Sequence, residues 1–121
     1  MAKTIGIVGL GLIGGSFAKA LKKYTPHSVV GFDISEETLN KALSENAIDE
    51  AGDKSSLCRL DILFIALYPS DTIEYVRSNI KSFKKGCIIV DFCGVKEYIC
   101  SQLDDLCHDN DIVFIGGHPM A

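Results

Sequence analysis

The 121-residue sequence contains no tryptophan and only three prolines, and aromatic residues make up 8% of it. It has no apolar run that approaches the roughly 20 residues a membrane-spanning helix needs. It has no Cys-x-x-Cys pair, and we see no repeat, low-complexity stretch or linker-like segment. These absences argue against a membrane span, a repeat architecture and a chain divided into domains by a linker.

The composition indicates one folded domain. Hydrophobic residues make up 47% of the chain, and its length is enough for a single core. The net charge of −4 argues against a nucleic-acid or membrane-surface partner. The first residues, 1–4, lead directly into an apolar stretch and lack the layout of a secretory signal. We therefore expect a cytoplasmic protein whose five cysteines are reduced thiols.

No metal site is predicted. Cys93, Cys100 and Cys107 recur every seven residues. This spacing is better explained as a coincidence on one helix face than as a ligand set.

Residues 4–16 join an apolar strand to a glycine-rich turn. The strand runs into Gly9-x-Gly11-x-x-Gly14, and a helical pattern begins inside that run. In this motif the first glycine permits a tight turn, the second lets the backbone approach a pyrophosphate, and the third packs the helix against the strand. The helix N-terminus then presents free N–H groups to the anion. The residues predicted to bind a dinucleotide here are Gly9, Gly11, Leu12, Ile13 and Gly14.

Asp33 strengthens this interpretation. It lies 19 positions after Gly14, at the end of a second apolar stretch, where a carboxylate can accept hydrogen bonds from the adenosine ribose. Ile34 and Ser35 follow it, so no neighbouring Arg or Lys can receive a 2′-phosphate. The sequence therefore predicts NAD rather than NADP as the cofactor.

Strands alternate with helices along the whole chain. Branched apolar strands are expected at 4–8, 28–33, 61–67, 87–91 and 111–115, whereas 48–51 is either a short strand or a loop. This alternation predicts an α/β fold, a Rossmann-type doubly wound parallel sheet with helices on both faces, in a single domain of residues 1–121.

Two helices have predicted details. The first is expected to bury Ile13, Phe17, Ala20, Leu21 and Tyr24, which recur at helical spacing. Ser35 is the expected N-cap of the second helix, and Ser70 or Asp71 that of the helix after 61–67.

Polar segments follow several strands at the edge where ligands bind. Tyr68, Pro69 and Ser70 fit the border of the nicotinamide ribose, but an ordinary strand-to-helix turn explains them equally well. Leu67, Tyr68 and Pro69 are counted among the predicted cofactor-binding residues.

Three segments resemble prephenate dehydrogenase of tyrosine biosynthesis: Gly9–Ser16, Asp91–Lys96 and Gly116–Ala121. The last reads Gly-Gly-His-Pro-Met-Ala and is the most specific. The resemblance implies an NAD-dependent oxidative decarboxylation of prephenate to 4-hydroxyphenylpyruvate. It also implies that His118 is catalytic, with Gly94, Lys96 and His118 at the substrate. A helical second domain, which dimerises and helps to bind substrate, is implied to lie outside these 121 residues.

The family commonly has a serine before its Val-Lys pair, where this sequence has Gly94, so that hydroxyl is missing. Lys96 is explained as well by a solvated surface lysine as by a substrate contact. Arogenate is an alternative substrate. A stand-alone NAD-binding or redox-sensing module without catalysis is an alternative of another class.

Overall fold

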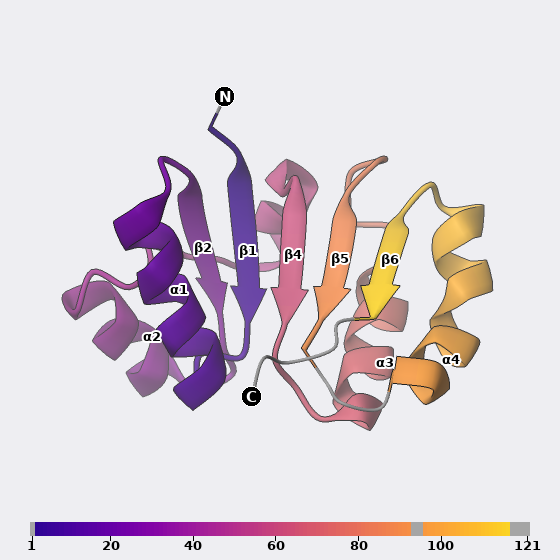
Figure 1. The fold of residues 1–121 in the computed structure, drawn as a ribbon, viewed down its shortest axis with the longest axis horizontal. Helices are drawn as coiled ribbons and strands as arrows, with labels where there is room; N and C mark the ends of the chain where they lie inside the picture. Colours follow the sequence, from indigo (N-terminus) through magenta and orange to yellow (C-terminus); the bar gives the residue numbers. More distant parts are fainter. Residues whose placement is uncertain (1, 93–95, 117–121) are drawn as a thin grey trace.

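The computed structural model describes residues 2–92 and 96–116, without the side chains of residues 96–98 and 100. Within these residues six parallel strands form one sheet in the order β3-β2-β1-β4-β5-β6 (Figure 1). The strands are β1 (Thr4–Val8), β2 (Ser28–Phe32), β3 (Glu50–Ala51), β4 (Ile62–Ile65), β5 (Ile88–Asp91) and β6 (Val113–Gly116). The helices are α1 (Leu12–Tyr24), α2 (Glu36–Ser44), the 3₁₀ helix η1 (Lys54–Arg59), α3 (Pro69–Asn79) and α4 (Lys96–Asp109). The chain starts at the centre of the sheet and winds outward to each edge, so the predicted α/β Rossmann-type doubly wound fold is confirmed.

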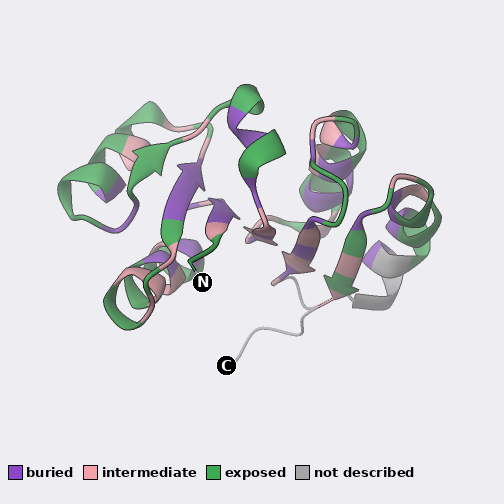
Figure 2. Cartoon of the chain, turned by 90° about the horizontal axis from the view of Figure 1, so that it is seen from above, coloured by how far each residue is buried: buried purple, intermediate pink, exposed green. Residues whose placement is uncertain are grey.

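Helices α1 and α2 pack on one face of the sheet. Their core joins Ile7 and Val29 from the strands to Ala18 of α1 and Ala42 of α2. Figure 2 shows the buried residues concentrated on the strands, between helices on either side.

The opposite face is covered by η1, α3 and α4. This larger core contains Leu57 of η1, Val76 of α3 and Leu103 of α4, packed on Leu63 and Ile89 of the strands. Successive strand residues point to opposite faces, so the two cores take alternate residues of β1 and β2, Ile7 and Val29 on one side and Val8 and Val30 on the other.

The residues of α1 that are buried lie one position further along the chain than the predicted ones. Ile13 and Tyr24 are exposed, whereas Gly14 and Ala18 are the buried residues of α1. Phe17 and Leu21 only pack against the edge of that core. Small residues let the helix approach the sheet closely, so the larger ones are displaced to its flanks.

The helix starts confirm one predicted cap and correct another. Ser35 caps α2, since its hydroxyl accepts a hydrogen bond from the backbone N–H of Thr38 at 3.2 Å. In α3, Tyr68 is the N-cap and Pro69 is the first helical residue. Ser70 and Asp71 therefore lie inside the first turn, because a proline at the first helical position moves the helix start upstream of them.

The carboxyl ends of the strands meet at one edge, as parallel register requires. Val8, Phe32 and Ile65 lie side by side there, and Ile65 pairs with Asp91. The third strand, left open by the sequence, is only two residues long and pairs with β2 at the outer edge. The loops that follow these strand ends form the site described next.

Candidate nucleotide-binding site

Two of the three motif glycines are required by the protein's own packing. Gly9 has φ = +88°, and a Cβ there would lie 2.5 Å from the carbonyl oxygen of Ala66. A Cβ on Gly14 would lie 1.8 Å from the carbonyl oxygen of Gly9. A side chain at Gly9 would push the turn away from the segment after β4, and one at Gly14 would push α1 away from the turn, so both glycines shape the loop.

Gly11 is different. Its backbone is extended, with φ = −71°, and a Cβ built there meets nothing within 4 Å. Neither backbone strain nor packing in the described structure therefore requires glycine at this position. The open space beside Gly11 is where the motif brings a pyrophosphate against the backbone.

The N-terminus of α1 lies at this space, and no described side chain caps it or balances its positive dipole end. The N-cap residue, Gly11, has no side chain that could cap the helix. The first turn of α1 contains no acidic residue in the described part of the chain. By contrast, α2 has its Ser35 cap and two glutamates in its first turn. The first N–H groups of a helix have no partner within the helix and carry its positive dipole end. Helix α1 is thus left ready to receive an anion.

Asp33 is fixed beside the glycine loop. Its carboxylate accepts a hydrogen bond from the backbone N–H of Leu10 at 2.8 Å and another from that of Ser35 at 2.9 Å. The two bonds use different oxygens, and each carboxylate oxygen can accept more than one. The carboxylate therefore has capacity left to accept from ribose hydroxyls.

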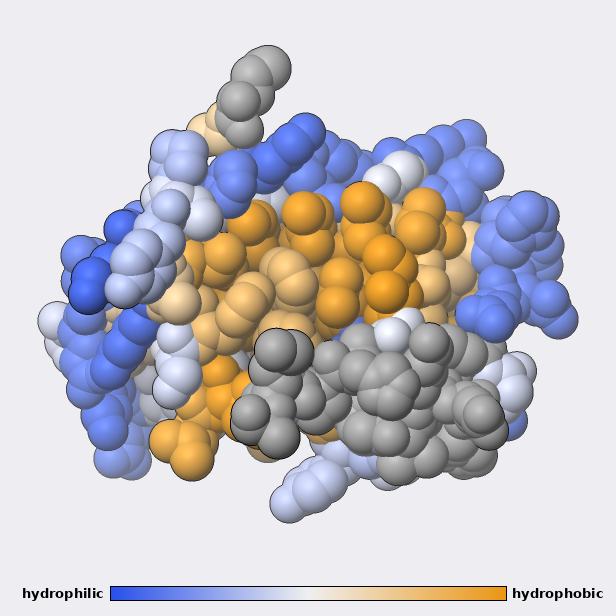
Figure 3. Space-filling view, viewed as in Figure 1, coloured by the Kyte–Doolittle hydropathy of each residue, from blue (hydrophilic) through white to orange (hydrophobic). Residues whose placement is uncertain are grey.

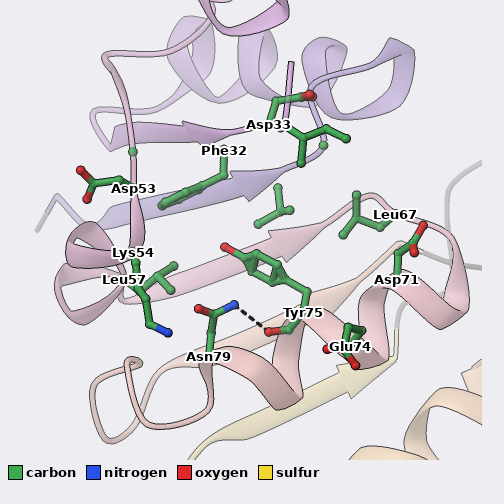
Figure 4. Close-up of a pocket in the computed structure, with 14 residues that line it drawn as sticks. Phe32, Asp33, Asp53, Lys54, Leu57, Leu67, Asp71, Glu74, Tyr75 and Asn79 are labelled. Carbon is green, nitrogen blue, oxygen red and sulfur yellow. Dashed lines mark hydrogen bonds between the residues drawn. The ribbon is translucent and has the colours of Figure 1, made fainter. Parts of the chain in front are cut away.

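Two adjoining cavities occupy this edge. The first measures about 560 Å³ and lies between the end of β2, η1 and α3. In Figure 4 the rings of Phe32 and Tyr75 project into it from β2 and α3. The second, of about 600 Å³, contains the glycine loop, Tyr68 and Phe92. Both cavities are lined by Gly9, Asp33, Ile34, Leu67 and Asp71. Because they share these five residues, the two cavities adjoin as one groove along the carboxyl edge of the sheet.

The first cavity is acidic. Among the residues that the structure describes, Asp33, Asp53, Asp71 and Glu74 line it, and Lys54 is the one cation. The hydroxyl and backbone N–H of Ser55 donate to Asp53 and hold its pKa below the ordinary value, so it stays ionised. An additional phosphate group in this cavity would meet repulsion from these charges.

Tyr75 stays neutral in this cavity, because burial raises its pKa to about 12. Its ring adds an apolar wall, and Asn79 donates a hydrogen bond to its backbone oxygen at 2.9 Å (Figure 4).

Sequence reasoning missed part of this cavity. Asp53 and Lys54 lie at the start of η1, in a region whose structure the sequence did not reveal. On α3, polar residues at positions 71, 75 and 79 follow a spacing of four, which was the one available signal of a helix face turned to the groove.

The predicted cofactor residues gather at this groove. Leu12, Ile13 and Tyr68 are 89%, 58% and 81% exposed, unusual values for apolar side chains, and all three line the second cavity. Leu67 lines both cavities, whereas Pro69 is the first residue of α3, directly after them.

The predicted substrate residues are placed only in part. Gly94 and His118 lie outside the described residues. Lys96 is the first residue of α4, with no described side chain. Their roles remain predictions.

Two further properties hold for residues 2–92 and 96–116. No helix among them is long and apolar enough to cross a membrane. No group of three or more His, Cys, Asp or Glu side chains among them is placed to hold a metal ion.

Comparison with known proteins agrees with this geometry. Residues 17–121 match the family described as "Prephenate dehydrogenase, nucleotide-binding domain". The chain is 37% identical to prephenate dehydrogenase of Lactococcus lactis over 98% of its length, and 34% identical to that of Bacillus subtilis over 100%. It spans about one third of these relatives, 34% and 33% of their lengths respectively.

Solved structures match the fold closely. An Aquifex aeolicus prephenate dehydrogenase in complex with hydroxyphenyl propionate and NAD⁺ superposes with a TM-score of 0.87 at 25% identity, covering 99% of this chain and 42% of that one. Arogenate dehydrogenase of Synechocystis superposes with a TM-score of 0.86 at 33% identity, covering 96% of this chain and 40% of that one. With the glycine loop, the acidic groove and the family match over most of its residues, the chain belongs to the family of prephenate dehydrogenase nucleotide-binding domains.

Proposed function

We propose that residues 1–121 bind NAD as the nucleotide-binding domain of an NAD-dependent prephenate dehydrogenase. The observation that carries the binding proposal is the open space beside Gly11 at the uncapped start of α1. The pyrophosphate would lie there and accept hydrogen bonds from the backbone N–H groups of Leu12 and Ile13. Asp33 would accept from the adenosine ribose, and the cavity walled by Phe32 and Tyr75 would take the adenine.

The acidic first cavity supports NAD over NADP. A 2′-phosphate on the ribose would approach the Asp33 carboxylate, and like charges at close range disfavour binding. The other acidic side chains of that cavity would add to this repulsion.

The proposed reaction is the oxidative decarboxylation of prephenate to 4-hydroxyphenylpyruvate in tyrosine biosynthesis. NAD supplies the acceptor for the hydride that leaves the ring carbon bearing the 4-hydroxyl, and carbon dioxide is lost as the ring becomes aromatic. The 4-hydroxyl becomes a carbonyl and must give up its proton. We assign His118 as the general base, because a neutral imidazole can accept a hydrogen bond from that hydroxyl near neutral pH. The assignment rests on the Gly-Gly-His-Pro-Met-Ala resemblance. Gly94 and Lys96 are assigned to the substrate side on the same ground.

The assignment of His118 is tested by His118→Asn in a polypeptide of the relatives' full length. A general base contributes about 10² to 10⁴ in rate, so turnover should fall by about that factor while NAD binding stays within about twofold. His108→Asn is the matched control, since His108 is exposed near the end of α4. Wild-type turnover in His118→Asn would refute the assigned role.

The 121-residue chain provides a second test. It should bind NADH but show negligible turnover of prephenate, because the groups that hold the substrate's carboxylates are assigned to a second domain. Efficient turnover by this chain alone would refute that division. If the full-length form bound NAD and turned over neither prephenate nor arogenate, the non-catalytic binding module would be the better interpretation.

Arogenate is the second candidate substrate, favoured by the 33% identity to the Synechocystis enzyme. Arogenate carries an amine where prephenate has a keto group. Comparing kcat/KM for the two substrates in the full-length form decides between them.

We further propose that the full-length form is a cytoplasmic homodimer. The resemblance assigns dimerisation to the helical second domain. Sedimentation of the full-length form tests the dimer.

A further inference from the structure

The Phe32 ring rests against a residue that has no side chain. Hydrophobic side chains gather over the middle of the molecule in Figure 3, but Phe32 is only 7% exposed and forms part of the wall of the first cavity. Gly52, directly after β3, lies against this ring. A Cβ built on Gly52 would lie 2.5 Å from Cε1 and 2.6 Å from Cζ of Phe32, whereas ordinary van der Waals contact begins at 3.4 Å. The ring therefore fills the space that a side chain at position 52 would need.

Backbone conformation does not require glycine here. In the described part of the chain, Gly9 and Gly86 are the glycines with a positive φ, so alanine could adopt the backbone of Gly52. The N–H of Gly52 donates to the carbonyl of Gly31 at 2.8 Å and continues the pairing of β3 with β2. What position 52 needs is space rather than backbone freedom.

The chain at Gly52 is held on both sides. On one side is the hydrogen bond to Gly31. On the other, the N–H of Asp53 donates to the hydroxyl of Ser56 at 3.1 Å, and the Asp53 side chain caps η1. The segment cannot withdraw from Phe32 without breaking the strand pairing or the cap. A side chain added at position 52 would therefore displace the groups around it and not its own backbone.

Of the groups around position 52, the Phe32 ring is the one with room to move. The added Cβ would also lie 2.6 Å from Cγ1 of Val30, but Val30 is packed in the core and only 1% exposed. The Phe32 ring instead projects into a cavity of about 560 Å³. In Figure 4 it lies between the segment that carries Asp53 and the side chain of Tyr75. Restoring van der Waals contact would move the ring by about 1 Å, away from position 52 and into the cavity.

We propose that Gly52 is a positioning residue for the base of the cofactor. Because it has no side chain, it lets the Phe32 ring lie back against the end of β3 and leaves the first cavity wide enough for a planar base beside Tyr75. The inference rests on the proposed binding of NAD, whose adenine is assigned to this cavity. Gly52 acts through Phe32: a ring pushed into the cavity would meet the base, while Asp33 and the glycine loop would keep their arrangement.

Gly52→Ala in the 121-residue chain tests this role. Its affinities for NADH and for ADP-ribose should both fall about 10- to 100-fold, because both ligands carry the adenosine and overpacking a filled site has a cost of that size. Gly6→Ala is the matched control, since its Cβ would lie 2.6 Å from Cδ1 of Leu60, a core side chain outside both cavities. It should destabilise the fold in urea but leave both affinities within about twofold. An equal loss of affinity in Gly6→Ala would overturn the proposal.

A smaller side chain at position 32 should restore binding. The double variant Gly52→Ala, Phe32→Leu has room for the added methyl group, so it should bind ADP-ribose at least about threefold more tightly than Gly52→Ala does. A merely structural role predicts no recovery, and that result, like an unchanged affinity in Gly52→Ala, would overturn the inference. Calorimetric titration measures all the variants. A wild-type chain that bound neither NADH nor ADP-ribose would instead refute the proposed function.

Discussion

The carboxylate of Asp33, at the end of β2, accepts a hydrogen bond from the backbone N–H of Leu10 at 2.8 Å. This bond ties the proposed ribose-binding residue to the loop that would hold the pyrophosphate. The start of the loop is held in addition, since the N–H of Gly9 donates to the carbonyl of Phe32 at 2.8 Å. The proposed site is therefore rigid before any ligand binds, which reduces the ordering cost of binding.

Asp33 should control the choice between NADH and NADPH. Replacing it with Asn keeps the shape but removes the charge, so NADH affinity should fall about 10- to 100-fold, as expected for a lost charge-assisted hydrogen bond. NADPH affinity should fall less, which narrows the preference, and Asp33→Ala should do the same. Fluorescence titration with both nucleotides measures this.

The exposed Glu36, at the start of α2, provides the control as Glu36→Gln. Its removal should leave the preference unchanged. Wild-type protein that bound NADPH as tightly as NADH would contradict the role of Asp33.

The motif glycines should separate into binding and folding roles. Gly11→Ala meets open space, so the free energy of unfolding should change by no more than about 1 kcal/mol, while NADH affinity should fall at least about tenfold. Gly14→Ala places a Cβ 1.8 Å from the Gly9 oxygen and should destabilise the fold by about 3 kcal/mol or more. Urea denaturation and NADH titration of both variants test the distinction. Normal NADH binding by Gly11→Ala would show that no phosphate approaches that backbone.

The cysteines should differ in reactivity. Cys58 is exposed, whereas burial raises the pKa of both Cys87 and Cys107 to about 11. Thiolates are the reactive species, so at pH 8 Cys58 should react with a thiol reagent much faster than the two buried thiols. In denaturant all five cysteines should react without prior reduction. Fewer than five would indicate a disulfide or a bound metal and would contradict the reducing compartment.

Acid should lower the free energy of unfolding through Asp61, which lies at the amino ends of the strands and accepts a hydrogen bond from the N–H of Thr4. The ammonium of Lys84 and then the backbone N–H of Thr4 hold the pKa of Asp61 below its ordinary value. A depressed folded-state pKa adds stability above the unfolded value of about 3.9, and that stability is lost as the pH falls through the folded-state pKa. Asp61→Asn should therefore lower the free energy of unfolding by about 1 kcal/mol at pH 7, with a smaller difference at pH 3.

Urea denaturation at the two pH values measures the effect of Asp61→Asn. Asp105→Asn is the control, because Asp105 is an exposed carboxylate on α4. An equal penalty from Asp61→Asn at pH 7 and pH 3 would show that the charge of Asp61 is not its cause.

The local patterns in the sequence determined most of the fold and part of the site. Apolar strands, the glycine motif and Asp33 act through short-range geometry, so the positions of the strands, the tight turn at Gly9 and the Ser35 cap could all be predicted. The buried stripe of α1 could not be predicted. Gly14 packs closely on the Gly9 carbonyl, so the face of α1 that bears Gly14 and Ala18 is turned to the sheet, and the larger apolar residues lie beside that face.

The tertiary structure alone decided which distant residues share a surface. Asp53 of the η1 turn and Glu74 of α3 lie 21 positions apart in the sequence, yet they line one cavity with Asp33. Likewise, residues of η1, α3 and α4 come together on one side of the sheet, in a single core with Leu63 and Ile89. A continuous apolar run indicates that a strand is apolar on both sides, but the element that covers each side is set by where the connecting helices cross the sheet.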